Sequence, residues 1–457
     1  MGKVKIIASI GPSSSDIHVL LRMAREGVDG FRLNFSHGTH EEKKREISLI
    51  REVESRLGKP IPIIGDLSGP SIRIGEVPVY EVKRGQKLKI IPALKGDRNT
   101  IPLPSIDVFN ALEEEDILLL SDGKIALRVE EVTLNHISAI ALNDGVIKSR
   151  ASIVVKGKEF HTSALTEKDL KDIEFCINND IEYIALSYVR SADDVRALKD
   201  ILGEKGREDI RVIAKIETKS AVSNLDQIVE EADVILIARG DLGMHFPLEE
   251  IPKLQKEITM KSLSRGKPVI VATQLLESVV YNPTPTRSEI VDVMTAVCDG
   301  VDALLLTDET TVGKYPIEAV RWLKRIIEAY EDRSCVKIPG VNETIYDKFA
   351  KGITLLAESM NAKIIAYTRS GNTARRLSRY RPATPLIAVA SNIKVARQIS
   401  ILWGVKAYSK KVDNLGNIWD TIRDFLKQKG EIAYGDIVIM TIGLRKGTTD
   451  LVRIEMI

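Results

Sequence analysis

The sequence predicts an α/β protein: a (β/α)8 TIM barrel with an inserted small β-barrel lid domain and a C-terminal α/β domain. Three observations predict it: eight continuous apolar runs that each precede an amphipathic stretch, one long interruption, and a second α/β pattern near the C-terminus. Continuous apolar runs are typical of parallel strands buried on both faces. Eight strand–helix repeats favour a closed barrel over an open doubly wound sheet.

The predicted barrel strands and helices alternate along the chain. The strands are expected at residues 5–10, 30–33, 61–65, 182–186, 211–215, 234–238, 268–272 and 303–306. The helices are expected at residues 17–25, 41–57, 167–178, 192–202, 219–230, 248–264, 287–297 and 316–330. No G-x-x-x-x-G-K-[ST] loop and no G-x-G-x-x-G turn follows a strand, which argues further against an open nucleotide-binding sheet.

The repeat is interrupted after the third strand, where the next helix is postponed to about Thr166. The intervening residues alternate between apolar and polar, as at 125–129, and contain Asp-Gly turn signals. We therefore expect residues 74–160 to form a small inserted β-barrel that can close over an active site. The catalytic barrel then comprises residues 1–73 and 161–335.

A separate α/β domain is expected at residues 336–457, after a linker at 332–340. Its predicted helices are 342–359, 373–380, 393–400 and 415–428, and its predicted strands are 363–367, 386–390, 436–441 and 451–454. This pattern predicts a second, smaller sheet with helices packed on it.

Composition and charge exclude several classes of protein. The chain has 457 residues, of which 44% are hydrophobic and 28% charged, as in soluble globular proteins. A net charge of +2 gives no support to a nucleic-acid or membrane-surface partner. No apolar run reaches the roughly 20 residues of a membrane-spanning helix. The cysteines are far apart and the N-terminus carries no export signal, so we expect a cytoplasmic protein.

Polar residues after the predicted strands are candidates for an active site, because the C-terminal ends of barrel strands line it. Lys215 and Glu217 are two residues apart and therefore point the same way in an extended chain. Asp241 follows the next strand and adds a second carboxylate. Two carboxylates with open positions suit Mg²⁺ or Mn²⁺, which can polarise an enolate or bridge a phosphoryl group. A lone Lys-x-Glu is more often a buried ion pair, but beside Arg-Gly-Asp on the next strand we favour the metal site.

Further side chains follow the second and third strands. Arg32 and Arg73 are candidates to clamp a phosphate group with their planar guanidinium forks. A surface arginine is a reasonable alternative for each alone, but it is weakened because both follow barrel strands. Asn34, Ser36 and Asp66 supply oxygens that suit a monovalent cation, and an ordinary hydrogen-bonded turn is the alternative.

Two residues near the ends of the sixth and seventh strands suit substrate binding. Gly240 lacks a Cβ where a substrate carboxylate can approach the N–H groups that open the next helix. Thr273 offers a hydroxyl for proton delivery, although a lone threonine at a strand end is more often structural.

Five motifs of this chain, in this order, closely resemble those of the pyruvate kinase family, and the resemblance covers essentially the whole chain. The motifs are Arg32-Leu33-Asn34-Phe35-Ser36-His37-Gly38, Lys215-Ile216-Glu217, Ala238-Arg239-Gly240-Asp241-Leu242-Gly243, Ala272-Thr273-Gln274-Leu275-Leu276-Glu277-Ser278 and Pro285-Thr286-Arg287. The resemblance implies transfer of the phosphoryl group of phosphoenolpyruvate to ADP, giving ATP and pyruvate in glycolysis, by a homotetramer.

The resemblance also implies roles for individual residues. Lys215 would stabilise the transferring phosphoryl group, and Glu217 and Asp241 would hold Mg²⁺. The substrate would be bound by Arg32, Lys215, Gly240, Asp241 and Thr273, with Thr273 in the proton relay and Arg73 on the transferring phosphate or ADP. The nucleotide neighbours would be Pro12, Asn34, His37 and Arg73.

The chain departs from the family pattern at the monovalent cation site. Asn34, Ser36, Asp66 and the backbone carbonyl of Leu67 match the K⁺ site of the family. Ser71, however, stands where K⁺-dependent members carry glutamate. We therefore expect weak or absent dependence on K⁺.

Three other departures concern the lid and the barrel mouth. Ala151 falls near the position of the usual lid lysine, for which Arg150 or Lys148 would substitute. Residues 307–310 read Thr-Asp-Glu-Thr in place of Ser-Gly-Glu-Thr, and His245 stands where glutamate is common.

In the C-terminal domain, a strand is followed by the loop Thr368-Arg369-Ser370-Gly371-Asn372-Thr373, which opens a helix. Backbone N–H groups and hydroxyls there suit a phosphate nest, and by family resemblance a phosphorylated effector; an ordinary helix N-cap is the alternative. Residues 443–449 resemble a short form of the family's effector loop.

Two rival functions share part of this pattern. A metal-dependent aldol lyase acting through a pyruvate enolate would use the same carboxylates but has no need of an ADP site or a lid. A catalytically silent phosphometabolite sensor would use the C-terminal domain alone and has no need of Lys215, Glu217 and Asp241.

Overall fold

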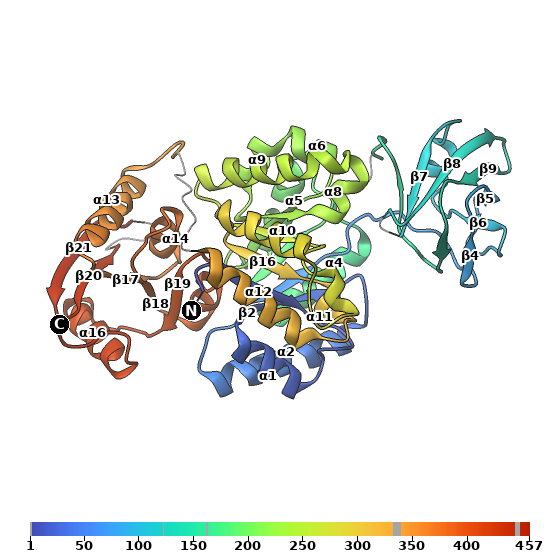
Figure 1. Ribbon diagram of the computed structural model, residues 1–457. Coiled ribbons are helices and arrows are strands. Elements are labelled where there is room, and N and C mark those ends of the chain that lie inside the picture. Colours follow the sequence, from blue (N-terminus) through green and yellow to red (C-terminus); the bar gives the residue numbers. More distant parts are fainter. Residues whose placement is uncertain (1, 122, 161–162, 332–339, 444–447) are drawn as a thin grey trace.

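The computed structural model describes residues 2–121, 123–160, 163–331, 340–443 and 448–457. The chain forms three bodies in a row, with the barrel in the middle, the β-rich insert at one end and the α/β domain at the other (Figure 1). The start of the chain lies on the side of the barrel that faces the α/β domain. The predicted linker at 332–340 falls, apart from Gly340, outside the described residues.

The predicted eight-stranded barrel is confirmed, and all eight predicted strands belong to it. Its strands pair in parallel in the closed order β1-β16-β15-β14-β13-β12-β3-β2. They are β1 (Lys5–Ser9), β2 (Val28–Asn34), β3 (Ile63–Asp66), β12 (Tyr183–Leu186), β13 (Arg211–Ile216), β14 (Val234–Ala238), β15 (Val269–Ala272) and β16 (Ala303–Leu306). Their inward side chains form one apolar cluster, which Ile401 of the α/β domain joins.

Helices cover the outside of the barrel. They are α1 (Ile17–Glu26), α2 (His40–Leu57), α4 (Glu167–Asn178), α5 (Ala192–Glu204), α6 (Lys219–Ser223), α7 (Leu225–Glu231), α8 (Arg239–His245), α9 (Ile251–Ser264), α10 (Arg287–Cys298), α11 (Asp308–Thr311) and α12 (Pro316–Tyr330). Capping boxes begin α2 at Thr39, α4 at Thr166 and α10 at Thr286. Each of these boxes satisfies backbone N–H groups that the first turn of the helix leaves unpaired.

Two predicted helices are not continuous. The stretch predicted at 219–230 is broken at Asn224 into two short helices. The side chain of Asn224 donates to the carbonyl of Arg190 at 2.8 Å. The stretch predicted at 248–264 begins with a separate 3₁₀ turn, Leu248–Glu250. The α-helix follows it with Pro252 in its first turn, where no N–H is needed.

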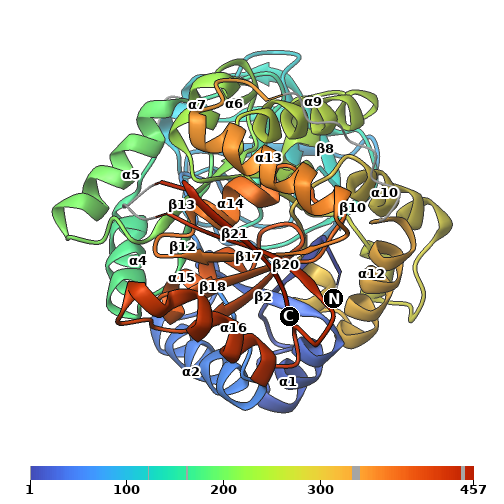
Figure 2. The same ribbon diagram turned by 90° about the vertical axis from the view of Figure 1, so that its left-hand side faces the viewer.

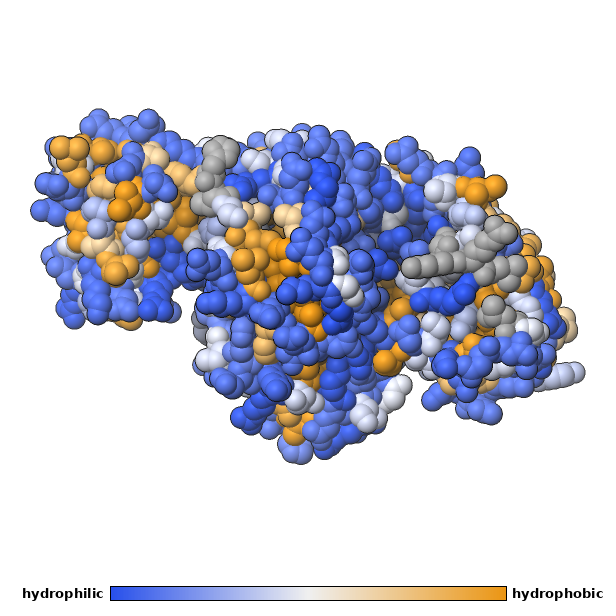
Figure 3. Space-filling view, turned by 180° about the vertical axis from the view of Figure 1, so that it is seen from behind, coloured by the Kyte–Doolittle hydropathy of each residue, from blue (hydrophilic) through white to orange (hydrophobic). Residues whose placement is uncertain are grey.

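The insert consists of β4 (Tyr80–Val82), β5 (Lys87–Ile91), β6 (Thr100–Pro102), α3 (Ile106–Asn110), β7 (Ile117–Leu120), β8 (Ile125–Val132), β9 (Ile137–Ala141), β10 (Gly145–Ile147) and β11 (Ile153–Val155). Its strands form a six-stranded sheet, β11-β7-β8-β9-β5-β6, and a two-stranded sheet, β10-β4, around one apolar core. It stands away from the barrel (Figure 1), and Figure 3 shows hydrophobic side chains on its surface. Leu94 and Leu134 are among the exposed hydrophobic residues of the insert.

The C-terminal domain has a five-stranded sheet in the order β19-β18-β17-β20-β21, with only the edge strand β21 antiparallel. Its elements are α13 (Ile345–Ser359), β17 (Lys363–Thr368), α14 (Asn372–Arg379), β18 (Leu386–Ala390), α15 (Ile393–Ile399), β19 (Val405–Ser409), α16 (Ile418–Gln428), β20 (Ile437–Ile442) and β21 (Leu451–Met456). In the view of Figure 2 this domain lies in front of the barrel. The sequence did not predict β19.

The two ends of the barrel have different neighbours. Residues just before the barrel strands, such as Glu182 and Asp302, contact the α/β domain through Arg397 and Arg381. The ends of the strands face the other way, toward the insert. Within the described residues, no helix is long and apolar enough to cross a membrane.

Candidate active site

A cluster of buried charges occupies the mouth of the barrel, at the C-terminal ends of its strands. Lys215, near the end of β13, places its Nζ 2.8 Å from Glu217 Oε1 and 3.3 Å from Asp66 Oδ1. Its ammonium also donates to Ser187 Oγ at 2.7 Å. The two-residue spacing of Lys215 and Glu217 therefore does put both side chains on one side of the strand.

The electrostatics of this cluster fix its ionisation. Burial alone would lower the pKa of Lys215, but the carboxylates of Asp66 and Glu217 raise it above the ordinary lysine value. Burial would raise the pKa of Asp66, yet Lys215 and Arg32 hold it below its usual value. The cluster therefore presents a permanently charged ammonium at neutral pH.

Arg32, on β2, is held from two sides. Its Nε donates to Asp66 Oδ2 at 2.6 Å and its Nη1 donates to Ser9 Oγ at 2.9 Å. These contacts orient the guanidinium at the mouth beside Lys215, and its side chain keeps 13% of its surface exposed. A fixed, partly exposed fork of this kind suits the recognition of phosphate.

Glu217 and Asp241 are the two carboxylates that suit a divalent cation. Glu217 is 1% exposed, and its Oε2 accepts the backbone N–H of Tyr188 at 2.7 Å. Asp241 lies in the first turn of α8, which directly follows β14. In the part of the chain that the structure describes, no group of three or more His, Cys, Asp or Glu is arranged for a metal. A site at the mouth would thus need water and substrate oxygens for its remaining positions, as Mg²⁺ commonly does.

Thr273 and Gly240 contact each other across β15 and α8. The N–H of Gly240 donates to Thr273 Oγ1 at 2.8 Å, and a Cβ added at Gly240 would lie only 3.3 Å from that oxygen. Thr273 and Gln274 both have positive φ, 68° and 52°. Such angles are costly for residues with a side chain and need support from their surroundings.

That support comes from Arg239, whose role the sequence did not reveal. Its Nη2 donates to the carbonyls of Thr273 and Gln274, both at 2.8 Å, and its Nη1 pairs with Asp292 at 2.7 Å. Arg239 thus holds the strained turn that presents the Thr273 hydroxyl. Ser187 was also missed, because a single serine after an apolar run carries no signal of its own.

The predicted nucleotide neighbours gather on the side of the mouth near β1 and β2. Burial lowers the pKa of His37, and the nearby cations Arg73, Lys43 and Arg32 lower it further. Pro12 is exposed in the loop after β1, which is tied to α11 by the N–H of Ser13. A neutral His37 among cations suits an anionic ligand.

Arg73 connects this region to the insert. Its Nη1 donates to the carbonyl of Arg150 at 3.1 Å, its Nε donates to Ser71 Oγ at 3.3 Å, and its backbone pairs with Ser152. Of the two residues suggested to substitute for the lid lysine, Arg150 pairs with Glu76 at 3.0 Å and Lys148 is exposed. Ala151, near the usual position of that lysine, packs on the core of the insert.

Three of the four residues predicted to bind K⁺ already accept hydrogen bonds with the oxygens concerned. Asp66 accepts from Arg32 and Lys215, and the carbonyl of Leu67 accepts from Ser187 Oγ at 2.8 Å. Asn34 Oδ1 accepts the N–H of Ser36 at 2.9 Å, which forms a local turn.

A lysine that the sequence did not single out lies in the same region. Lys168 Nζ donates to the carbonyl of Phe35 at 2.6 Å, to Ser68 Oγ at 3.2 Å and to Asp172 at 2.6 Å. It adds a cation from α4 next to the predicted monovalent site.

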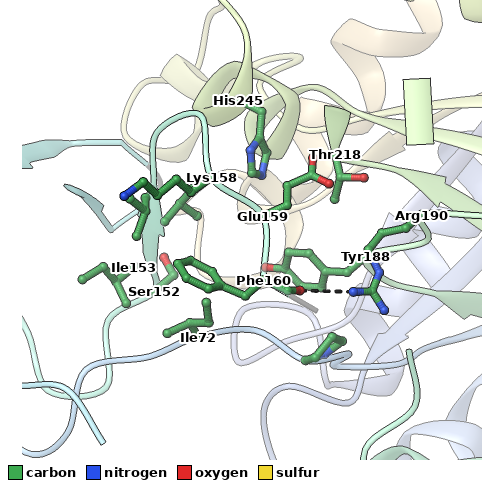
Figure 4. Close-up of a pocket in the computed structure, with 13 residues that line it drawn as sticks. Ile72, Ser152, Ile153, Lys158, Glu159, Phe160, Tyr188, Arg190, Thr218 and His245 are labelled. Atoms are coloured by element: carbon green, nitrogen blue, oxygen red, sulfur yellow. Dashed lines mark hydrogen bonds between the residues drawn. The ribbon is translucent and has the colours of Figure 1, made fainter. Parts of the chain in front are cut away.

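A cavity of about 70 Å³ lies at the junction of the insert and the barrel (Figure 4). On one side Glu159 accepts the N–H groups of Lys219 and Ser220, at 2.6 and 3.1 Å, at the start of α6. On the other side Arg190 donates to the carbonyl of Phe160 at 3.1 Å. These two contacts fasten the end of the insert to segments that directly follow Ser187 and Glu217.

His245, at the end of α8, also lines this cavity (Figure 4). Burial lowers the pKa of its imidazole, which nearby Glu159 partly opposes. Glu309 belongs to the segment 307–310, whose sequence differs from the family pattern, and lies elsewhere at the mouth. It is buried and accepts the N–H groups of Leu276 and Thr307.

The predicted effector loop is a compact turn at the start of α14. Thr368 Oγ1 accepts the N–H of Gly371 at 2.9 Å, and the φ of 86° at Gly371 suits only glycine. Thr373 Oγ1 lies 3.1 Å from Thr449 Oγ1. The carbonyl of Ser370 accepts from Arg211 at 3.4 Å, and Asn372 is the first residue of α14. Residues 444–447 of the short loop lie outside the described residues.

Comparisons with known proteins agree on one family. A family model described as the barrel domain of pyruvate kinase matches residues 1–320, and a model of its alpha/beta domain matches residues 347–455. A pyruvate kinase of Geobacillus stearothermophilus is 37% identical over 473 residues, covering 100% of this chain and 80% of the relative.

Two further relatives cover nearly their whole lengths. A pyruvate kinase of Pyrobaculum aerophilum is 36% identical over 97% of this chain and 95% of the relative. One from Clostridium acetobutylicum is 34% identical over the full length of both chains. The barrel, its charged mouth and these matches lead to one conclusion: the chain belongs to the pyruvate kinase family of phosphotransferases.

Proposed function

We propose that this chain transfers the phosphoryl group of phosphoenolpyruvate to ADP, giving ATP and pyruvate, as the last step of glycolysis in the cytoplasm. The observation that carries the proposal is the ammonium of Lys215, which Asp66 and Glu217 keep charged at the barrel mouth beside Arg32. Phosphoryl transfer needs little covalent help from a protein and depends on fixed positive charge and positioning.

Lys215 and Arg32 act on the phosphoryl group. Both side chains are held by carboxylates and hydroxyls before substrate arrives, so they need not reorganise as negative charge moves between oxygens. Glu217 and Asp241 would hold Mg²⁺ or Mn²⁺, and that ion, when bound, would neutralise charge on the enolate and phosphoryl oxygens.

Gly240 and Thr273 act on the rest of the substrate. The start of α8 offers N–H groups to the substrate carboxylate, next to a residue without a Cβ. Thr273 Oγ1 accepts from Gly240, so its own hydrogen is directed away from that bond. The hydroxyl is therefore available to deliver a proton to the enolate carbon once the phosphoryl group has left.

ADP is proposed to bind on the side of Pro12, Asn34, His37 and Arg73. The cations that lower the pKa of His37 also favour a bound polyphosphate. Arg73 contacts the insert through Arg150, which supports a role for the insert as a lid over the nucleotide. An aldol lyase would have no use for this group, and a silent sensor would have no use for the charged mouth.

Dependence on K⁺ is proposed to be weak or absent. The support is that Asp66 and the Leu67 carbonyl already accept from Arg32, Lys215 and Ser187, and that Ser71 provides no carboxylate.

Assembly as a homotetramer and control by a phosphorylated effector at Thr368–Thr373 are also proposals. Exposed apolar side chains on the edge strand β21, including Ile454 and Met456, support an interface there. Light scattering that gives the mass of a monomer at micromolar concentration would contradict assembly.

The deciding experiment measures ATP formation from phosphoenolpyruvate and ADP with Mg²⁺ in wild type and in Lys215→Met. We expect wild-type turnover and a loss of roughly 10³-fold or more in the variant, the scale of removing a preorganised electrostatic group. Lys261→Met, on the exposed side of α9, is the matched control and should keep wild-type turnover. Equal turnover with and without Lys215, or no turnover in any of the three proteins, would refute the proposal.

A further inference from the structure

The turn that follows β15 adopts a backbone conformation that side chains disfavour. Thr273 and Gln274 both have left-handed φ, 68° and 52°, and neither is glycine. A left-handed residue is costly because its Cβ crowds the following carbonyl, so two in succession persist only where their surroundings hold them. The turn carries the hydroxyl that we propose as the proton donor. The contacts that hold the turn therefore bear on the reaction.

Arg239 and Gly240, which are adjacent in the chain, hold this turn from two sides. The Nη2 of Arg239 donates to the carbonyls of Thr273 and Gln274, both at 2.8 Å, and its Nε reaches the Thr273 carbonyl at 3.3 Å. The backbone N–H of Gly240 donates to Thr273 Oγ1 at 2.8 Å. The guanidinium thus fixes the backbone of the turn, and the N–H fixes the direction of its hydroxyl.

The charge of Arg239 is balanced by a carboxylate from another helix. Arg239 is 7% exposed, and its Nη1 donates to both oxygens of Asp292 at 2.7 Å. The neutral side chain of Gln255 is a more distant acceptor at 3.4 Å. Among the described residues, Asp292 is the one carboxylate that pairs with this guanidinium. A buried guanidinium needs such a partner, because leaving a buried charge unpaired is costly.

Asp292 acts on the site through Arg239. It lies on α10, in the outer layer of the barrel, and its side chain is 40% exposed. In the part of the chain that the structure describes, the hydrogen bonds of its carboxylate go to Arg239 alone. Asp292 therefore contacts neither the turn nor the charges at the mouth, but it sets the orientation of the side chain that holds the turn.

We propose that Asp292 is a positioning residue for proton delivery: it orients the guanidinium of Arg239, which keeps the Thr273 turn in the conformation that presents its hydroxyl. The inference rests on the proposed function and on the role of Thr273 in it. In this step the π electron pair of the enolate forms a C–H bond with the hydroxyl proton, and the enolate C–O becomes the pyruvate carbonyl. The alkoxide left on Thr273 takes a proton from water.

Phosphoryl transfer depends on other contacts. Lys215 is held by Asp66 and Glu217, and Arg32 is held by Asp66 and Ser9. Removing the carboxylate on α10 should therefore impair proton transfer more than phosphoryl transfer, whereas general damage to the fold would lower both together.

The test separates the two halves of the reaction in the full chain. ATP formation from phosphoenolpyruvate and ADP reports phosphoryl transfer. Exchange of the methyl hydrogens of pyruvate with heavy water, followed by NMR with Mg²⁺ and ATP present, reports proton transfer. Asp292→Asn keeps the shape of the side chain and removes its charge, and Asp292→Glu keeps the charge.

Asp226→Asn is the matched control. Asp226 lies on α7 of the barrel, has a partly exposed side chain and pairs with Arg265 at 2.9 Å. The remaining hydrogen bond of Arg265 goes to the carbonyl of Lys261, so this pair is not bonded to the Thr273 turn. The control removes the same atoms from an ion pair of the same kind.

We expect exchange in Asp292→Asn to fall roughly tenfold or more, a part of the 10²–10⁴-fold that a positioned acid contributes. ATP formation should fall by less, and KM for ADP should stay within about twofold, because the proposed ADP side of the mouth is untouched. Asp292→Glu should recover most of the exchange, and Asp226→Asn should match wild type in both assays.

Exchange in Asp292→Asn equal to that of wild type, or exchange and ATP formation lowered by the same factor, would overturn the inference. The proposed function would stand in that case if wild type forms ATP, whereas a wild type that forms none would refute both. If Asp292→Asn does not fold, the same comparison is made in a Gln274→Gly background, because glycine adopts a φ of 52° without strain. The ratio of exchange to ATP formation decides there as well.

Discussion

The two ends of the barrel both carry buried ion pairs, but they are built differently. At the base, Glu182 accepts from Arg51 at 2.7 and 2.9 Å, from Arg397 at 3.1 Å and from the N–H of Ile63 at 2.8 Å. At the mouth, one ammonium, Lys215, serves two carboxylates. At the base two arginines and a backbone N–H converge on one acid, whereas at the mouth the Lys215 ammonium is shared between Glu217 and Asp66, and Arg32 adds a second cation only to Asp66.

The charges at the base join domains and stabilise the fold, whereas we propose that the charges at the mouth act in the reaction. The arginines at Glu182 come from α2 of the barrel and from the α/β domain, so the base network joins two domains. The mouth cluster lies at strand ends, where carboxylate lone pairs remain for a cation and where we propose that the Lys215 ammonium faces the substrate. Removing a charge should therefore cost stability at the base and turnover at the mouth.

The largest expected effect is that of Glu217→Gln at the mouth. We expect kcat/KM for phosphoenolpyruvate to fall on the order of 10³-fold, because a divalent cation loses one of its two anionic ligands. Lys215 keeps Asp66 as a partner, so the free energy of unfolding should change little. Steady-state kinetics over a range of Mg²⁺ concentrations, with urea unfolding alongside, check both parts. A variant that is destabilised but fully active would contradict the division of roles.

The matched variant at the base is Glu182→Gln, which changes the same atoms at the other end of the barrel. It removes one of the two carboxylates that Arg51 and Arg397 share and leaves Glu54, so we expect a loss of about 1–3 kcal/mol in the free energy of unfolding. The folded variant should keep its KM values. Urea unfolding, together with kinetics measured at urea concentrations below the unfolding transition, tests this. A variant that is as stable as wild type but has a reduced kcat would contradict the comparison.

Local patterns account for most of what the sequence predicted. Continuous apolar runs identified all eight barrel strands, and the two-residue period placed Lys215 and Glu217 together. The pattern failed where the outcome depends on contacts distant in sequence. The helix is broken at Asn224, which bonds to the distant residue Arg190, and β19 is an edge strand with no long apolar run to reveal it.

The same limit applied to the site. The residues that follow the predicted strands identified the candidate acids and the lysine. The hydrogen bond of Lys215 to Ser187, and that of Arg239 to the carbonyl of Thr273, depend on how separate strands meet. The residues at the strand ends predicted that oxygens of Asn34, Ser36 and Asp66 lie close together, and β2 and β3 do pair Asn34 with Asp66. Residue types alone do not show that Asp66 and the Leu67 carbonyl already accept hydrogen bonds from Arg32, Lys215 and Ser187.

A smaller effect is expected when K⁺ is replaced by tetramethylammonium at constant ionic strength. Since Asp66 and the Leu67 carbonyl already have protein donors, kcat should change by less than about tenfold, or ~1.4 kcal/mol in the barrier. Restoring a carboxylate with Ser71→Glu is the informative partner variant and should increase the dependence. A wild-type enzyme that loses most of its rate without K⁺ would show that the mouth needs a further cation.

The last expected effect is a pH dependence of stability at the base. Lys267 precedes β15 and donates to the carbonyls of Glu230 and Ala232 at 2.9 and 2.6 Å. Burial, together with nearby Arg375, lowers its pKa from 10.5 to about 8. Between those values the unfolded chain binds a proton that the folded chain has lost, so stability should rise with pH from about 8 to about 10.5.

The measurement is the difference in unfolding free energy between wild type and Lys267→Met, followed from pH 7 to pH 10.5. The difference should be constant below about pH 8 and should then shift in favour of wild type as pH rises, because only wild type releases this proton on folding. Other lysines titrate equally in both proteins and cancel. A difference that falls with pH would mean that Lys267 stays charged and is paired in the fold, which would make the base resemble the mouth.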